Sequence, residues 1–140
     1  MSTQKIVNYK TGAVIIEKPY TEVKSQKELV EFAVKEGYNL RGANLIGAQL
    51  EYANLYRGRL FDAVLQRAKL AHANLSSASL TSANLHGARL LNANLTCASL
   101  TNTNLTFCYL VGANLKHTAL PSPTMVLLAE WGHVSNELTA

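Results

Sequence analysis

The sequence predicts an all-β solenoid, in which short extended segments turn repeatedly in one sense to form a coil. Three observations lead to this prediction. Leucine occupies every fifth position from Leu40 to Leu120, without an interruption. A small residue stands two positions before nearly every one of these leucines. The chain has 140 residues, which is enough for one domain with a hydrophobic core.

A period of five residues fits neither an α-helix nor one long strand. On a helix, each step of five would move the side chain by about 140° around the axis, so the leucines would not share a face. On a flat strand, an odd period would direct successive leucines to opposite faces. The small residue and the leucine of one unit are two positions apart, however, and point to the same side of an extended backbone. Both can therefore face inward if the chain turns a corner before the next unit.

The inward positions are interpreted as packing. Burying one leucine side chain stabilises a fold by roughly 1.5–3 kcal/mol, and the interior of a solenoid is dry and filled. Thr103 and Cys108, which replace alanine at two small positions, are interpreted in the same way. We therefore expect function to reside on the outer surface.

The repeating unit resembles that of a known family. Stretches such as Ala43-Asn44-Leu45-Ile46-Gly47 and Ala83-Asn84-Leu85-His86-Gly87 are similar to the A-(D/N)-L-x-x unit of pentapeptide repeat proteins. The resemblance implies a right-handed quadrilateral β-helix with four units per coil, so that residues 38–120 would form about four coils. Residues one coil apart would then stack at the spacing of paired strands.

Residues 1–37 are predicted to form an N-terminal cap, because open strand edges at the end of a solenoid invite aggregation. Lys5–Tyr9 and Ala13–Glu17 are predicted to pair as a β-hairpin. A helix is expected from the capping box Ser25–Glu28 to about Glu36.

Residues 121–140 are predicted to form a C-terminal helical cap. Pro121 and Pro123 interrupt the repeat, and Thr124–Trp131 is expected to be a short apolar helix. Some relatives self-associate through their C-terminal ends, so the resemblance adds a homodimer through this end as an alternative.

If residues twenty apart stack, the outward side chains form columns. Asparagine fills most of two columns just before the leucines, and its amide groups are expected to hydrogen-bond along each column. A third column brings Lys69 and Arg89 together, beside exposed apolar residues. Mixtures of basic, aromatic and apolar side chains favour binding. The resulting candidate for partner binding consists of Lys69, Arg89, Leu91, Tyr109 and Val111. The alternative is that the cations extend into water and the apolar residues have no role.

A second candidate patch lies near the first coil. In it, Ile46, Phe61 and Val64 are expected to be exposed among several arginines. The patch comprises Arg41, Ile46, Arg57, Arg59, Phe61, Val64 and Arg67. The alternative is that it contacts the N-terminal cap.

Enzymatic chemistry is not predicted, and neither a cofactor nor a metal site is expected. Glu51 and Asp62 are the only acids between residues 40 and 120, and they fall on different faces. The four histidines share no column, which disfavours a metal site. The phosphate-binding motifs GxxxxGK and GxGxxG do not occur. Two cysteines and no apolar signal segment are typical of a cytoplasmic protein.

The sequence therefore favours a non-enzymatic scaffold that binds a protein partner through its outer faces. The alternative is a weak binder of polyanions such as nucleic acid, because seven cations and two acids lie between residues 40 and 120. The best understood branch of the resembled family imitates DNA with an acidic surface and binds topoisomerases. That role is disfavoured here, because the charge has the opposite sign.

Overall fold

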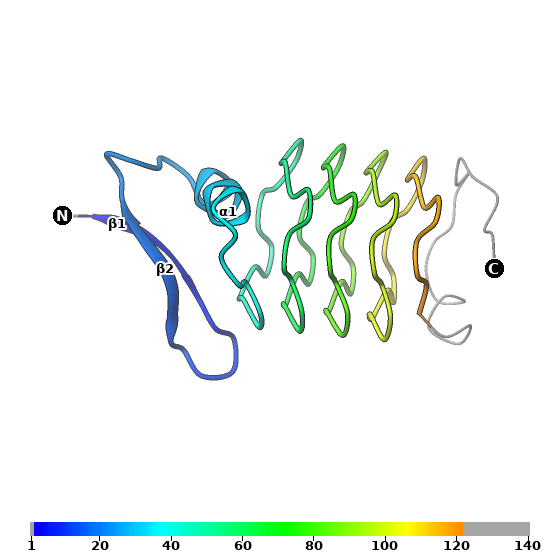
Figure 1. Ribbon diagram of the computed structural model, residues 1–140, viewed down its shortest axis with the longest axis horizontal. Coiled ribbons are helices and arrows are strands. Elements are labelled where there is room, and N and C mark those ends of the chain that lie inside the picture. The colour runs from blue at the N-terminus through cyan, green and yellow to red at the C-terminus, as the bar shows by residue number, and fades with distance from the viewer. Residues whose placement is uncertain (1, 122–140) are drawn as a thin grey trace.

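The computed structural model describes residues 2–121 (Figure 1). Strands β1 (Thr3–Val7) and β2 (Val14–Pro19) form an antiparallel hairpin and are followed by helix α1 (Gln26–Lys35). The rest of the described chain is a solenoid built from parallel pairs, which agrees with the predicted all-β solenoid. The predicted C-terminal helix lies outside the described residues. Within residues 2–121, no helix is long and apolar enough to cross a membrane.

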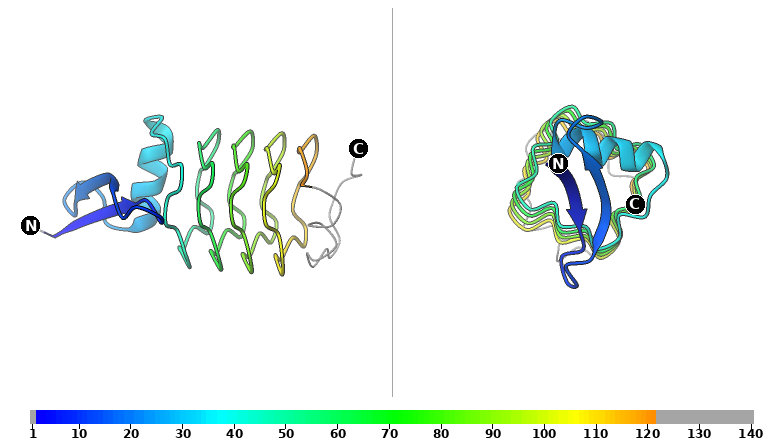
Figure 2. Two further views of the ribbon diagram at one scale, coloured as in Figure 1. Left: turned by 90° about the horizontal axis from the view of Figure 1, so that it is seen from below. Right: turned by 90° about the vertical axis from the view of Figure 1, so that its left-hand side faces the viewer.

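The solenoid is held together by parallel pairing between residues twenty positions apart. Asn54 pairs with Asn74, and Asn74 pairs with Asn94. At the first of these pairs, the Leu55 amide donates to the Asn74 carbonyl at 2.8 Å, and the Asn74 amide donates to the Ala53 carbonyl at 2.9 Å. Viewed along the axis, the successive coils superpose on one four-sided outline (Figure 2). Outward side chains one coil apart therefore stand directly beside each other.

Every five-residue unit turns in the same way. The residue two positions after each leucine from Leu40 to Leu115 has a positive φ, for example 59° at His72. The next amide donates back to the carbonyl of that leucine, as from Ala73 to Leu70 at 3.0 Å. These are the features of a type II β-turn. One such turn per unit explains physically why the leucines recur every five residues.

Two glycines at this turn position differ in what surrounds them. A Cβ atom on Gly47 would meet no atom within 4 Å, whereas one on Gly112 would overlap the side chain of Asn92 in the neighbouring coil. Both have a left-handed backbone, with φ of 63° and 68°.

We expect Gly47→Ala to lower the free energy of unfolding by about 1 kcal/mol, the cost of a Cβ in the left-handed region. Gly112→Ala should cost more, because Asn92 must also move. Urea denaturation of both variants measures the difference. Adding Asn92→Gly to Gly112→Ala should recover part of the loss. Equal losses in the two single variants would contradict the close packing at Gly112.

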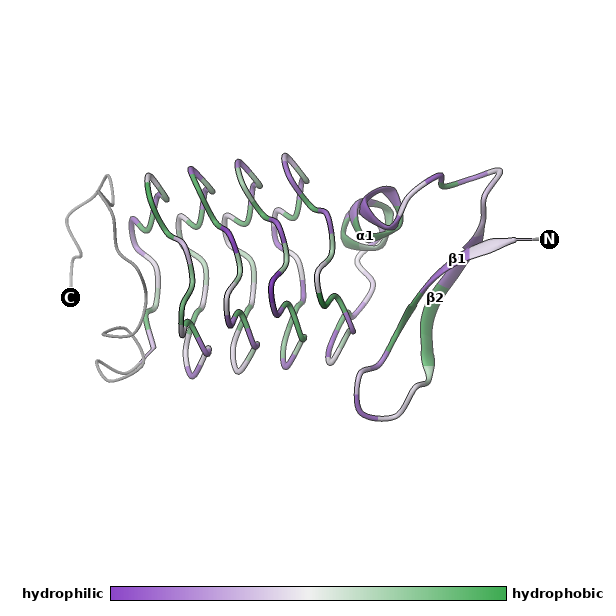
Figure 3. Cartoon of the chain, turned by 180° about the vertical axis from the view of Figure 1, so that it is seen from behind, coloured by the Kyte–Doolittle hydropathy of each residue, from purple (hydrophilic) through white to green (hydrophobic). Residues whose placement is uncertain are grey.

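The leucines fill the interior. Each one from Leu40 to Leu115 is at most 3% exposed, and Leu120 is partly buried against the same core. Hydrophobic and hydrophilic residues alternate along each coil, as Figure 3 shows. The buried hydroxyls of Thr103 and Thr118 donate to the carbonyls of Leu80 and Leu95, at 2.8 and 2.7 Å. Thr103 and Cys108 are therefore packing residues, as predicted.

The asparagine columns stabilise the turns more directly than the predicted bonding along each column suggests. Their side-chain oxygens accept from the backbone amide two residues later, as in Asn74 from Ser76 at 3.1 Å. The bond predicted along a column occurs between Asn104 Nδ2 and Asn84 Oδ1, at 3.4 Å. The amide of asparagine is short enough to reach its own backbone, which is the reason for its preference at turns. The same local bond forms at Asn39, Asn44, Asn54, Asn84, Asn94, Asn104 and Asn114.

The first strand of the hairpin begins and ends two residues earlier than predicted, because the loop begins at Asn8. The Asn8 side-chain oxygen accepts from the amides of Lys10 and Thr11, at 2.9 and 3.0 Å. The Tyr9 amide donates to the Gly42 carbonyl at 2.8 Å, so Tyr9 pairs with the coil and not with β2. The prediction that the strand extends to Tyr9 was wrong for this reason.

Helix α1 begins and ends where the sequence predicts, to within one residue. The Ser25 hydroxyl accepts from the Glu28 amide at 3.1 Å. The Glu28 carboxylate accepts from the Lys24 amide at 2.7 Å, one residue before the N-cap. After the C-cap Glu36, the Tyr38 amide donates to the Ala33 carbonyl at 2.9 Å and closes the helix end.

The hairpin and α1 lie across the first coil (Figure 2). The Asn44 amide donates to the Val7 carbonyl at 2.8 Å. Two side chains of α1 also serve as hydrogen-bond partners of this edge: Glu31 accepts from the Asn54 amide, and Lys27 donates to the Glu51 carbonyl, both at 2.8 Å. The N-terminal segment therefore forms hydrogen bonds with backbone groups at the open edge of the first coil.

Candidate partner-binding face

The first candidate patch is built on rigid backbone. Arg89 lies between Lys69 and Tyr109 in one column of parallel pairs. The Leu90 amide donates to the Tyr109 carbonyl at 2.7 Å, and the Tyr109 amide donates to the Ala88 carbonyl at 2.9 Å. Two positions along, the Asn92 amide donates to the Val111 carbonyl at 2.9 Å. The side chains of the patch are therefore presented at fixed spacing.

Four of the five predicted residues come together around one cavity of about 410 Å³. Its lining consists of Arg89, Leu91, Tyr109 and Val111. Leu91 is 40% exposed and Tyr109 is 49% exposed, whereas Val111 is half-buried. The fifth residue, Lys69, is the neighbour of Arg89 one coil earlier and does not line the cavity. We call this set of five residues the Arg89 face.

The two cations of the Arg89 face have no partners among residues 2–121. Ion pairs in this part of the chain join Lys18 to Glu22 and Arg41 to Asp62. Neither Lys69 nor Arg89 donates a side-chain hydrogen bond to another described residue. Two exposed like charges one strand spacing apart are mildly unfavourable. A ligand that carries negative charge would relieve this repulsion.

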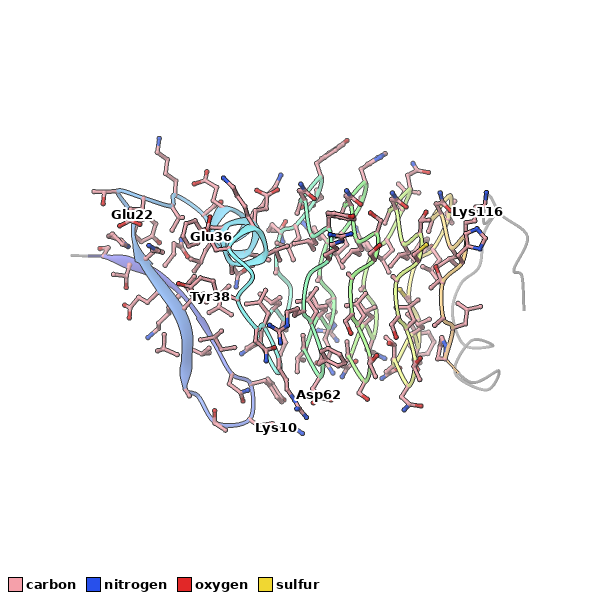
Figure 4. The ribbon with its side chains drawn as sticks, viewed as in Figure 1. Lys10, Glu22, Glu36, Tyr38, Asp62 and Lys116 are labelled. Carbon is pink, nitrogen blue, oxygen red and sulfur yellow. The ribbon has the colours of Figure 1, made fainter. Side chains whose placement is uncertain are left out.

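The second candidate patch is divided in the structure. Arg41 Nε pairs with Asp62 Oδ2 at 3.0 Å, and the Arg57 guanidinium lies 5.0 Å from the centre of the Tyr56 ring. Figure 4 shows Asp62 on the outside of the coil near the hairpin. The Arg41 carbonyl also accepts from the Asn8 side chain at 3.3 Å, so the patch contacts the N-terminal segment.

Val64 of this patch is buried, and the prediction that it is exposed was wrong. It retains 9% exposure, whereas Ile46 and Phe61 retain 45% and 41%. Ile46 and Phe61 occupy corners, where the turn directs side chains away from the coil. Val64 occupies the middle of a column and pairs with Asn44 on one side and Asn84 on the other. Arg59 and Arg67 remain exposed.

Stacked aromatic side chains form a feature that the sequence reasoning missed. The rings of Tyr52 and His72 stack in parallel, with centroids 4.8 Å apart. The rings of His86 and Phe107 meet edge to face at 5.5 Å. Tyr52 and His72 are twenty residues apart, so the column rule itself could have identified them. They lie at the corner column next to Leu91 and extend the surface around the Arg89 face.

A second cavity, of about 640 Å³, lies where α1 meets the first coil. Phe32 of α1 and Tyr56 of the coil lie on its wall, with Glu31 and Arg57 beside them. Glu31 is already bonded to the Asn54 amide, and Arg57 lies against Tyr56. Glu31 therefore joins the N-terminal segment to the coil, whereas Arg57 contacts a ring of the coil itself.

The two cysteines differ in environment. Burial raises the pKa of the Cys108 thiol to about 12, whereas Cys97 is exposed at a corner. Cys108 is therefore a protonated packing residue at neutral pH. No group of three or more histidine, cysteine, aspartate or glutamate residues within the described chain is arranged to hold a metal ion.

Comparisons with known proteins agree with the repeat. The profile described as pentapeptide repeats matches in eight copies, over residues 36–60, 59–96 and 98–120. Among curated proteins, none matches this sequence.

Three similar solved structures are pentapeptide repeat proteins. One, Rfr23 from the cyanobacterium Cyanothece 51142, is 38% identical and aligns over 58% of this chain and 52% of its own, with a TM-score of 0.37. Another, from the thylakoid lumen of Arabidopsis thaliana, is 30% identical over 57% of this chain and 52% of its own, with a TM-score of 0.41. A third, from Nostoc, is 28% identical over 66% of this chain and 73% of its own, with a TM-score of 0.45. The chain thus spans about half the length of the first two.

Proposed function

Because the chain belongs to the pentapeptide repeat family, we propose that it is a non-enzymatic scaffold that binds a protein partner through the Arg89 face. The observation that carries this proposal is the cavity beside two cations that have no partner in residues 2–121. The residues around it are an arginine, a leucine, a tyrosine and a valine. Such a set supplies apolar contact area and positive charge for recognition, and it contains no paired nucleophile and base.

The scaffold that presents this face is proposed to be a right-handed quadrilateral β-helix of about four coils, as in the family. Residues 1–37 would act as its N-terminal cap. The bonds from Val7, Glu31 and Lys27 to the first coil support this role, because they occupy donors and acceptors of an edge that could otherwise pair with another chain. Because this edge is covered, a partner would contact the outward side chains of the coil and not its backbone.

We expect the double variant Arg89→Glu, Leu91→Asp to lose capture of a partner from a lysate of the source cells. The substitutions reverse the charge of the face and place a carboxylate at the apolar wall, while both side chains point away from the core. Affinity capture followed by mass spectrometry compares the variant with the unaltered chain. The matched control is Ile46→Asp with Arg67→Glu, which makes the same kinds of change in the second patch.

Retained capture by the Arg89 face variant would remove this face from consideration, and loss in the control alone would assign binding to the second patch. Polyanion binding is the competing function, favoured by the excess of cations between residues 40 and 120. Titration of labelled duplex DNA at 50 and 200 mM salt separates the two, since contacts to several phosphates would weaken steeply, by about tenfold or more. Binding through the apolar cavity should change little over this range.

A further inference from the structure

We infer that the Arg89 face binds an acidic peptide segment of the partner, which inserts one apolar side chain into the cavity. The inference rests on the proposed function and specifies the chemistry of the ligand. Two properties of the face carry it: the composition of the cavity wall and the unbalanced charge beside it.

The cavity wall selects an apolar side chain. Leu91 and Val111 are neighbours in one column, and Tyr109 stands next to Arg89 in the other. Leu91 and Tyr109 together keep a large apolar area in contact with water, since they are 40% and 49% exposed. Covering this area with a leucine, isoleucine or phenylalanine of a partner would remove it from water, which is favourable in proportion to the area buried. The cavity of about 410 Å³ has room for such a side chain.

The charge beside the cavity selects carboxylates. Lys69 and Arg89 pair in adjacent coils, so their backbones are about 4.8 Å apart. The acidic residue in the column of Leu91 is Glu51, which lies two coils earlier. No described carboxylate pairs with either cation. An aspartate or glutamate beside the inserted residue would accept charge-assisted hydrogen bonds from them, and arginine would bind it with two parallel N–H groups.

The same features favour a peptide over a nucleic acid. Binding of single strands depends on aromatic rings that are free to stack on bases, together with a groove of cations along the backbone. On the Arg89 face one ring, that of Tyr109, stands among aliphatic side chains. The nearby rings of Tyr52 and His72 already stack on each other at 4.8 Å. The side chains of Leu91 and Val111 cannot form a hydrogen bond or an ion pair with a phosphate.

A phage library of randomised nine-residue peptides, selected on the immobilised whole chain, tests the inference. We expect enriched peptides to carry one large apolar residue flanked by aspartate or glutamate. Fluorescence anisotropy of the best labelled peptide should show at least a tenfold loss of affinity on Leu91→Asp. The charge reversal Lys69→Glu, Arg89→Glu should instead select peptides with lysine or arginine beside the same apolar residue. Circular dichroism verifies that each variant keeps its fold.

The outcomes separate the inference from the proposed function. Enriched peptides that depend on Leu91 but carry no acids would leave the face as a binding site and overturn the acidic ligand. Peptides indifferent to both variants, or no enrichment at all, would overturn the inference, while the capture experiment above would still decide the fate of the face. If labelled oligothymidine binds more tightly than the best peptide, and the Lys69→Glu, Arg89→Glu variant loses this binding, the face would be assigned to nucleic acid.

Discussion

Leu90→Ala should lower the free energy of unfolding by about 2–5 kcal/mol, whereas Leu91→Ala should lower it by less than about 1 kcal/mol. The two leucines are adjacent in the chain, but Leu90 is completely buried and Leu91 is 40% exposed. Truncation of Leu90 removes apolar contacts inside the coil and leaves a cavity that the tightly bonded backbone cannot close. Truncation of Leu91 removes surface that already touches water.

Urea denaturation followed by circular dichroism measures both changes. Since the residue type and the substitution are the same, the pair isolates the effect of facing inward or outward. A similar loss in both variants would contradict the assignment of every fifth leucine to the core. Leu91→Ala also supplies a folded protein with an altered Arg89 face for the binding experiments.

Cys108 should make the protein less stable at alkaline pH. Its pKa is raised by burial from 9.0 to about 12 in the folded protein. Below pH 9, the folded and unfolded chains both keep the thiol proton, so the contribution of Cys108 to stability does not change. Between pH 9 and about 12, the unfolded chain releases the proton and the folded chain retains it, so unfolding becomes more favourable by about 1.4 kcal/mol per pH unit.

Cys108→Ala provides the comparison, because alanine occupies this position in most other units. We expect the stability of the unaltered protein to fall relative to the variant by about 1.4 kcal/mol between pH 7 and pH 10. Other titrating groups affect both proteins equally and cancel in the difference. Parallel profiles for the unaltered chain and Cys108→Ala would show that the thiol ionises as readily in the folded protein as in the unfolded one.

The interior of this protein is predictable from sequence because one physical constraint repeats along it. A leucine and a small residue must face inward in each unit, and a turn with a left-handed residue must follow, so the period of five determines the coil. The start of the helix is equally predictable, since the capping box that begins at Ser25 is a local signal. The ends of the hairpin are not, because Asn8 and Tyr9 bond to the turn and to Gly42, and no local pattern reveals a contact with the coil.

The outer surface follows weaker rules. The rule that residues twenty positions apart stack follows from the coil itself. It therefore places Arg89, Leu91, Tyr109 and Val111 side by side, as the structure does. It did not distinguish Val64 from Ile46 and Phe61, since exposure also depends on how far a side chain extends beyond its neighbours. Nor could it reveal that Glu31 and Lys27 bond to the first coil, because the way α1 sits on that coil depends on packing and not on the repeat.

The uniform turn at every unit has a consequence for how such a chain can change in length. Each unit advances the surface by one quarter of a circuit, so duplication of four consecutive units would lengthen the rod and preserve the neighbours of every existing face. Duplication of a single unit would preserve the buried leucines equally well, yet it would rotate all later side chains onto the adjacent side. A unit inserted between Lys69 and Arg89 should therefore separate the two cations while every leucine still faces inward, so the proposed Arg89 face is more sensitive to such an insertion than the core.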